Sequence, residues 1–147
     1  MPSFRPARIS PTYRDTAAPR IPRREANKLR HYNILVAEDD PMIGLLLVDL
    51  LTAMGHKVCA LQTTEEGAVA AAAGCNPDLL LMDVHLSHGS GLQAVATIQR
   101  SKRIPYMYMT GALAQAGQPG DIVLYKPFVV ADLVDAIDRV SASDLAN

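Results

Sequence analysis

The 147-residue sequence has no uninterrupted apolar stretch near the roughly 18 residues that a membrane-spanning helix needs. It has only two cysteines, Cys59 and Cys75, which lie far apart in the sequence, and no secretion signal that would point to an oxidising compartment. A disulfide-rich secreted scaffold is therefore excluded. We expect a cytoplasmic, reduced protein in which both cysteines are small core residues with free thiols.

The chain also lacks tryptophan, and aromatic residues make up only 5% of it. Hydrophobic residues make up 49% and charged residues 20%, proportions typical of a soluble globular protein. The length allows one domain with a full core and is too short for two large ones.

Charge is unevenly distributed along the chain. Residues 1–32 hold eight of the 14 basic residues, only two of the 15 acidic residues and five of the ten prolines. Such a segment has few apolar residues and no periodicity, so we expect a disordered basic arm. Its arginines, with few aromatic side chains among them, can attract phosphate only nonspecifically. The arm could equally be an electrostatic tether or an extension with little function.

From Asn33 onward, short apolar runs alternate with segments of helical periodicity. The expected strands are residues 34–37, 58–61, 79–82, 106–109 and 122–125. In the first helical segment, opened by Pro41 and closed by Gly55, the apolar residues at helical spacing are Ile43, Leu46, Leu47, Leu50, Leu51 and Met54. This alternation predicts an α/β fold with a doubly wound, five-stranded parallel sheet of the flavodoxin-like kind.

The connection between the fourth and fifth expected strands departs from this alternation. Gly111–Gly120 contains three glycines and Pro119, which leaves room for at most about two helical turns. We therefore predict that the fourth crossover is shortened or irregular.

Polar residues follow the expected strands at the points where they end. Glu38, Asp39 and Asp40 follow the first strand, and Asp83 follows the third. Ligands of such sheets bind at the carboxyl ends of the strands, and clustered carboxylates repel each other unless a cation such as Mg²⁺ neutralises them. A hydroxyl and an ammonium group come after the fourth and fifth strands, at Thr110 and Lys126. Together these groups predict a phosphoryl site.

Four segments carry a family resemblance. ILVAEDD, PDLLLMDVHL, YMTG and YKPF, in this order and spacing, resemble the receiver domain of bacterial two-component response regulators. The resemblance covers about residues 33–141 and leaves 142–147 as a tail. It implies acceptance of a phosphoryl group from a sensor histidine kinase or a histidine phosphotransfer protein onto one aspartate, with Mg²⁺ as cofactor.

The resemblance also implies a role for each matching residue. Asp83 would be the phosphoacceptor. The metal would be held by Asp39 and Asp83 directly, by Glu38 mainly through water and by the backbone carbonyl of His85, while Asp40 is a supporting acid.

Two residues beyond the acidic cluster would contact the phosphoryl group. Thr110 would follow the phosphoryl oxygens on activation, and Lys126 would pair with them. Pro127 follows the lysine, as in the family, where the peptide bond between the two is usually cis.

The chain departs from the family where many members carry Tyr or Phe three positions before the lysine. Val123 stands there, and Tyr125 lies on the opposite side of a strand with a period of two. With the MTG after the fourth strand, this resembles an atypical subset with a Phe-Ala-Thr-Gly-like motif. Signalling through the usual aromatic switch is therefore not expected, whereas phosphorylation is unaffected.

We thus expect a single-domain response regulator, a signalling domain rather than an enzyme. It would act through an unknown downstream protein, or as a phosphate sink or relay, without binding specific nucleic acid or membrane, as a monomer or weak dimer.

One alternative is an adaptor that uses the receiver fold for docking without phosphorylation. A metal-dependent phosphatase is disfavoured because His85 stands where such enzymes place a second aspartate. Zinc binding by His85 and His88 has too few ligands to be favoured.

Overall fold

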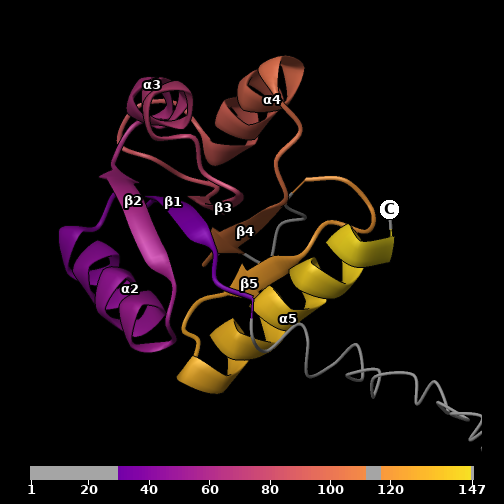
Figure 1. Ribbon diagram of the computed structural model, residues 1–147. Helices are drawn as coiled ribbons and strands as arrows, with labels where there is room; N and C mark the ends of the chain where they lie inside the picture. Colours follow the sequence, from indigo (N-terminus) through magenta and orange to yellow (C-terminus); the bar gives the residue numbers. More distant parts are fainter. Residues whose placement is uncertain (1–29, 112–116, 147) are drawn as a thin grey trace, which may run out of the picture.

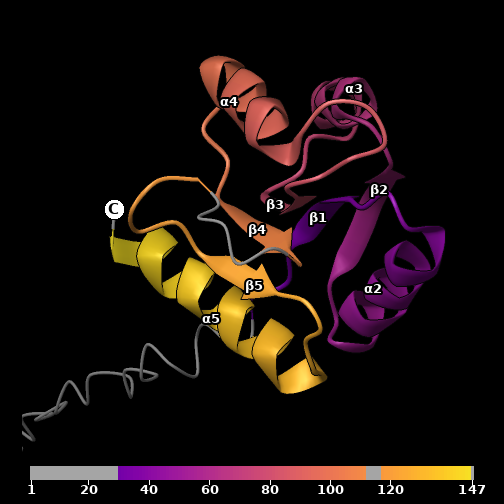
Figure 2. The same ribbon diagram turned by 180° about the vertical axis from the view of Figure 1, so that it is seen from behind.

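The computed structural model describes residues 30–111 and 117–146, which form a five-stranded parallel sheet between two layers of helices (Figures 1 and 2). The strand order is β2-β1-β3-β4-β5. The strands are β1 Asn33–Ala37, β2 Lys57–Gln62, β3 Leu79–Asp83, β4 Tyr106–Thr110 and β5 Val123–Tyr125. The predicted α/β, flavodoxin-like class is confirmed.

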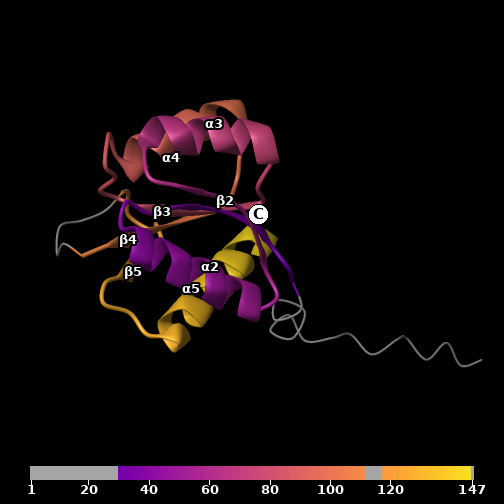
Figure 3. The ribbon, with the colours of Figure 1, turned by 90° about the vertical axis from the view of Figure 1, so that its left-hand side faces the viewer.

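Each face of the sheet is covered by two helices (Figure 3). One face packs against α2 Pro41–Ala53 and α5 Val130–Ala146, and the other against α3 Glu65–Cys75 and α4 Gly91–Ser101. Successive strand residues point to opposite faces, so Ile34 and Val36 enter the first core while Leu35 enters the second. Among the described residues, no helix has the length and apolar character of a membrane span.

The connection from β4 to β5 is irregular, as the glycines and the proline predict. Its described residues, Gly111 and 117–122, contain no helix. Gly117 and Gly120 have φ values of 72° and 93°, which L side chains rarely adopt. Residues 112–116 lie outside the described part of the chain.

The packed domain extends beyond both expected boundaries. Tyr32 is buried, and its hydroxyl hydrogen-bonds Ser141 Oγ at 2.6 Å. Arg30 lies over the Tyr32 ring and pairs with Asp144 at 2.8 Å, so the chain packs on the domain three residues before Asn33. At the other end, α5 continues through residues expected to form a tail. Residues 1–29 lie outside the described residues, and their disorder stays a prediction.

Helix α2 buries a narrower face than its apolar spacing suggests. Leu47 and Leu51 are fully buried, but Leu46 is 54% exposed, so its expected place in the core is wrong. Met42 and Leu45 are also exposed. The helix is apolar nearly all round, and periodicity alone could not separate its core-facing residues from its outer ones.

The expectation of two free thiols is also wrong, because Cys59 and Cys75 form a disulfide. Helix α3 packs on β2, and this brings its last residue within a Cα–Cα distance of 6.0 Å of Cys59. That separation is typical of disulfides. It results from the packing of a helix on the preceding strand, which the spacing of the two residues does not reveal.

Candidate functional site

The carboxyl ends of β1 and β3 lie side by side, since Ala37 pairs with Met82 across the two parallel strands. The next residues of each strand therefore meet at one edge of the sheet. Glu38, Asp39 and Asp83 each offer a carboxylate oxygen within 4.8 Å of the other two. Glu38 and Asp83 are buried, at 1% and 4% exposure, whereas Asp39 faces solvent.

Lys126 bridges two of these carboxylates. Its ammonium group donates to Glu38 Oε2 at 2.6 Å and to Asp83 Oδ2 at 2.8 Å. The backbone N–H of Lys126 donates to the Thr110 carbonyl at 2.9 Å, which extends the β4–β5 ladder by one residue and fixes the start of the side chain. The Lys126–Pro127 peptide bond is cis, as the resemblance predicts.

Burial and mutual contact alter the protonation of this cluster. Burial raises the pKa of Glu38 to about 7, with a further rise from Asp83, although the hydrogen bond from Lys126 opposes it. Burial tends to lower the pKa of Lys126, but its hydrogen bonds to Asp83 and Glu38 outweigh this and the pKa is raised. Lys126 thus stays charged at neutral pH, while Glu38 lies near half-protonation.

The cluster suits a divalent cation in charge and in donor chemistry. Three carboxylates face one ammonium group, so full ionisation leaves two negative charges without a partner. Carboxylate oxygens are hard ligands of the kind that Mg²⁺ prefers. The residues present here therefore fit Mg²⁺.

Asp40 lies beside the cluster but has a structural contact of its own. Its carboxylate accepts from the Met42 N–H at 2.9 Å and the Ile43 N–H at 3.4 Å, which caps the N-terminus of α2. Its backbone N–H donates to Glu38 Oε1 at 3.1 Å. Asp40 therefore supports the site by starting α2 and by orienting Glu38.

Asp40→Ala should lower the free energy of unfolding by roughly 1 kcal/mol, because two helical N–H groups lose their acceptor. The backbone bond to Glu38 remains, so we expect Mg²⁺ affinity to change by less than about threefold. Urea denaturation and calorimetric titration measure the two effects. A large loss of Mg²⁺ affinity without destabilisation would contradict the capping role and make Asp40 a ligand.

The loop after β3 contributes backbone contacts. The His85 N–H donates to Asp83 Oδ1 at 3.0 Å, so both oxygens of Asp83 accept a hydrogen bond. The imidazole of His85 is exposed, and the role of its carbonyl in metal binding stays a prediction. Within residues 30–111 and 117–146, neither His85 nor His88 belongs to a group of potential metal ligands.

Thr110 is the last residue of β4, the strand next to β3, and it is buried, at 1% exposure. It therefore lies at the same edge of the sheet as Asp83. In β5, Tyr125 is 53% exposed while Val123 packs toward α3 and α4, so Tyr125 does not take the place of the usual switch aromatic.

Gly91, the first residue of α4, lies against the site and was not predicted from the sequence. A Cβ atom there would collide with the backbone carbonyl of Asp83. The Gly91 N–H also donates to the Val84 carbonyl at 3.0 Å. Glycine thus lets α4 begin directly against β3. The only sign of this in the sequence is a lone glycine at the start of a helical pattern.

Comparison with known proteins agrees with this geometry. The family model described as "Response regulator receiver domain" matches residues 34–138. The chain therefore belongs to the response regulator receiver domain family, whose members are signalling domains of two-component systems.

Among curated relatives, the transcriptional regulatory protein PdtaR of Mycobacterium tuberculosis is 29% identical over 111 residues, which cover 71% of this chain and 54% of PdtaR. The phyllosphere-induced regulator PhyR of Methylorubrum extorquens is 35% identical over 113 residues, covering 72% of this chain and 42% of PhyR. The chain thus spans about half the length of these relatives.

Solved structures give the same family. The receiver domain of PhyR from Erythrobacter litoralis matches with a TM-score of 0.68 and 28% identity, covering 75% of this chain and 89% of that domain. PhyR from Brucella abortus matches with a TM-score of 0.70 and 26% identity, covering 83% of this chain and 54% of that protein.

Proposed function

We propose that the protein accepts a phosphoryl group on Asp83 in a Mg²⁺-dependent reaction. The donor would be a phosphohistidine of a sensor histidine kinase or of a histidine phosphotransfer protein. The observation that carries the proposal is the double contact of Lys126 with Asp83 and Glu38, inside a cluster of three carboxylates.

In this reaction a carboxylate oxygen of Asp83 attacks phosphorus. A P–O bond forms as the N–P bond of phosphohistidine breaks, and the imidazole nitrogen keeps the electron pair. Asp83 attacks as a carboxylate, which carries no proton for a general base to remove. Its buried position and its bond from the His85 N–H hold the carboxylate in one orientation.

Charge develops on the phosphoryl oxygens during transfer, and positioned donors stabilise it. Lys126 would move its hydrogen bond from Asp83 to a phosphoryl oxygen, and Thr110 would offer its hydroxyl. Asp39, Asp83, the His85 carbonyl and, through water, Glu38 would hold Mg²⁺. The ion supplies charge neutralisation when bound.

Output would pass through protein contacts in the cytoplasm, or the protein would serve as a phosphate sink or relay. PhyR from Bartonella quintana, whose solved structure is 25% identical to this chain, is called an anti-anti-sigma factor, a name that describes action on a protein. We propose only that this chain likewise acts on another protein, whose identity is unknown. It would do so as a monomer or weak dimer.

Beryllofluoride, a stable mimic of the phosphoryl group, tests the proposal. With Mg²⁺ present, we expect beryllofluoride to raise the melting temperature by several degrees above the value with Mg²⁺ alone, because a ligand that binds only the folded state stabilises it. Without Mg²⁺, beryllofluoride should have no effect. Asp83→Asn should remove the response. The docking-adaptor alternative predicts instead that melting is indifferent to both reagents.

Mg²⁺ affinity should increase with pH up to about 7 and then level off. Below that value Glu38 holds a proton in the folded protein, and cation binding must displace it. We expect up to about tenfold weaker binding per pH unit below 7. Calorimetric titration on both sides of neutrality measures this, with Glu38→Gln as the variant whose affinity should not vary with pH. If Mg²⁺ affinity changed equally with pH in the wild type and in Glu38→Gln, the assignment of the proton to Glu38 would be contradicted.

A further inference from the structure

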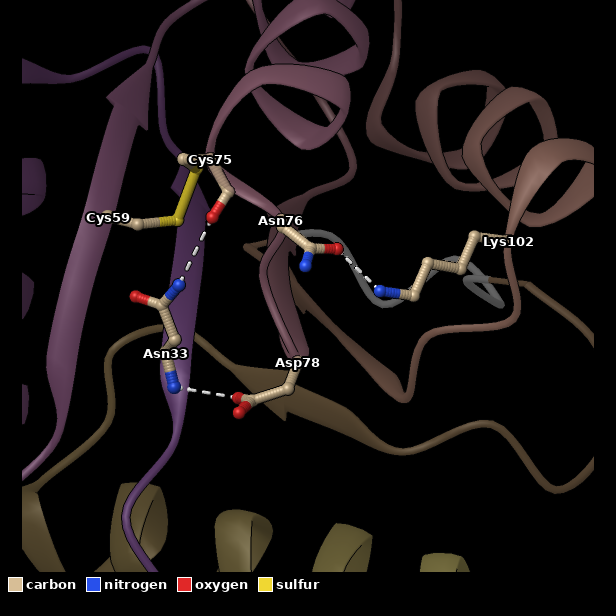
Figure 4. Close-up of a disulfide and its surroundings, with 6 residues drawn as sticks. All are labelled: Asn33, Cys59, Cys75, Asn76, Asp78 and Lys102. Atoms are coloured by element: carbon tan, nitrogen blue, oxygen red, sulfur yellow. Dashed lines mark hydrogen bonds between the residues drawn. A yellow bond between two sulfur atoms is a disulfide. The ribbon is translucent and has the colours of Figure 1, made fainter.

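A covalent bridge joins β2 to the last residue of α3. Figure 4 shows the bond between Cys59 on the strand and Cys75 at the helix end, with Asn33 and Asn76 close to Cys75. The bridge spans 16 residues of sequence. Neither cysteine has a part in the chemistry proposed for Asp83.

A register shift in β2 places Cys59 for this bridge. Ile34 pairs with Val58 and Leu35 with Ala60, so Cys59 has no opposite residue on β1. As a result Cys59 and Ala60 both pack toward α3 and α4, whereas Val58 packs toward α2 and α5. Such bulges redirect side chains, and they are frequent at sheet edges, where β2 lies. The strand is thus locally distorted where its cysteine meets α3.

Helix α3 buries few large apolar side chains. Of its 11 residues only Ala68 is fully buried, and the rest of its inner face is made of small side chains. Gly67 and Gly74 further reduce its helical preference. Elements with little buried apolar surface open locally at low free energy. A covalent bond at the end of α3 should therefore strongly increase the free energy needed to open this helix locally.

Other bonds hold this end of α3 when the bridge is open. The Cys75 carbonyl accepts from Asn33 Nδ2 at 3.3 Å, and Asn76 Oδ1 accepts from Lys102 Nζ at 2.5 Å. The Asn76 backbone, with φ of 53°, ends the helix in the left-handed conformation. These contacts indicate that opening the bridge loosens α3 without unfolding the domain.

The surroundings of the bridge also accommodate thiols. Asn33 Oδ1 is the one buried side-chain oxygen or nitrogen in the described residues without a hydrogen-bond partner. It belongs to the carboxamide whose Nδ2 donates to the Cys75 carbonyl, so the neighbourhood of the bridge contains an acceptor that lacks a donor. Both cysteines are partly exposed, so small redox reagents can reach them.

We propose that Cys59 and Cys75 form a reversible redox site, closed by a low-molecular-weight disulfide and opened by thiols, that fastens α3 to β2. In closing, one cysteine thiolate attacks the reagent disulfide and releases one thiolate. The second cysteine thiolate then attacks the mixed disulfide, forms the Cys59–Cys75 bond and releases the other. Two protein thiols are oxidised, one disulfide is reduced to two thiols, and the two protons pass to the released thiolates and solvent.

The test uses the full chain, reduced with dithiothreitol and then placed in buffers of varied glutathione to glutathione disulfide ratio. Alkylation followed by intact mass counts the free thiols. We expect two free thiols in reducing buffer, none in oxidising buffer, and full reversal when glutathione is restored. Closure should slow amide hydrogen exchange in residues 68–75 by about tenfold to a hundredfold, with no change in α5.

Three results would overturn the inference. They are thiols that stay alkylatable in excess glutathione disulfide, a glutathione adduct that never proceeds to the internal bridge, and closure without slower exchange in α3. The double variant Cys59→Ser, Cys75→Ser is the matched control. Its amide hydrogen exchange in α3 should be as fast as in the reduced protein and should not change with the redox buffer. If that variant fails to fold, the reduced and oxidised wild-type proteins provide the same comparison.

Discussion

Asp83→Asn should abolish formation of the phosphoryl adduct. An amide is neutral and a poor nucleophile toward phosphorus, yet it has the shape of the carboxylate, and its single oxygen can keep one of the two hydrogen bonds, from the His85 N–H or from Lys126. The fold should therefore survive while the reaction is lost. Intact mass after incubation with acetyl phosphate and Mg²⁺ measures the adduct, and circular dichroism checks the fold.

The matched control is Asp49→Asn, which changes an exposed aspartate on α2 that does not belong to the acidic cluster. It should be phosphorylated like the wild type. An adduct of undiminished amount on Asp83→Asn would show that another acid, such as Asp39, accepts the group, and would remove the basis of the proposed function.

Lys126→Met should slow phosphorylation by about a hundredfold, since one preorganised donor to the developing charge is lost. The methionine keeps the length and the apolar stem of the side chain. At a pH high enough to keep Glu38 ionised, Mg²⁺ affinity should not fall, because removal of the ammonium leaves the three carboxylates more negative toward the cation. The pKa of Glu38 should rise further, because its hydrogen bond from Lys126 opposes the effect of burial.

Single-turnover phosphorylation and calorimetric Mg²⁺ titration separate these effects. Lys57→Met, at the exposed start of β2, is the control for loss of one lysine charge. If Lys126→Met lost Mg²⁺ binding and phosphorylation together, Lys126 would be a scaffold for the acidic cluster rather than a donor to the phosphoryl group.

The order of the elements could be predicted because its signal is local. Alternating apolar runs and helical spacings identify strands and helices, and crossover handedness then arranges them as a parallel sheet. The acids also follow from this step, since residues after Ala37 and after Met82 must meet once β1 and β3 are neighbours. The sequence does not show that Lys126 contacts Glu38 and Asp83 at the same time, and this joint contact is seen only in the structure.

The features that the sequence did not reveal depend on contacts between distant segments. Leu46 is exposed because α2 is apolar beyond its buried face. Tyr32 is buried because α5 extends far enough to offer Ser141 to its hydroxyl. The disulfide depends on an unpaired residue in β2, and a bulge leaves no clear mark in a hydrophobic pattern.

Phosphorylation of Asp83 is tested most directly by the intact mass of the wild-type protein after incubation with acetyl phosphate, with and without Mg²⁺. We expect one phosphoryl group per chain with Mg²⁺, a large reduction without it, and a modified peptide that contains Asp83. A folded protein that gains no phosphoryl group under either condition and does not bind beryllofluoride would contradict it. The receiver fold would then serve as a docking surface.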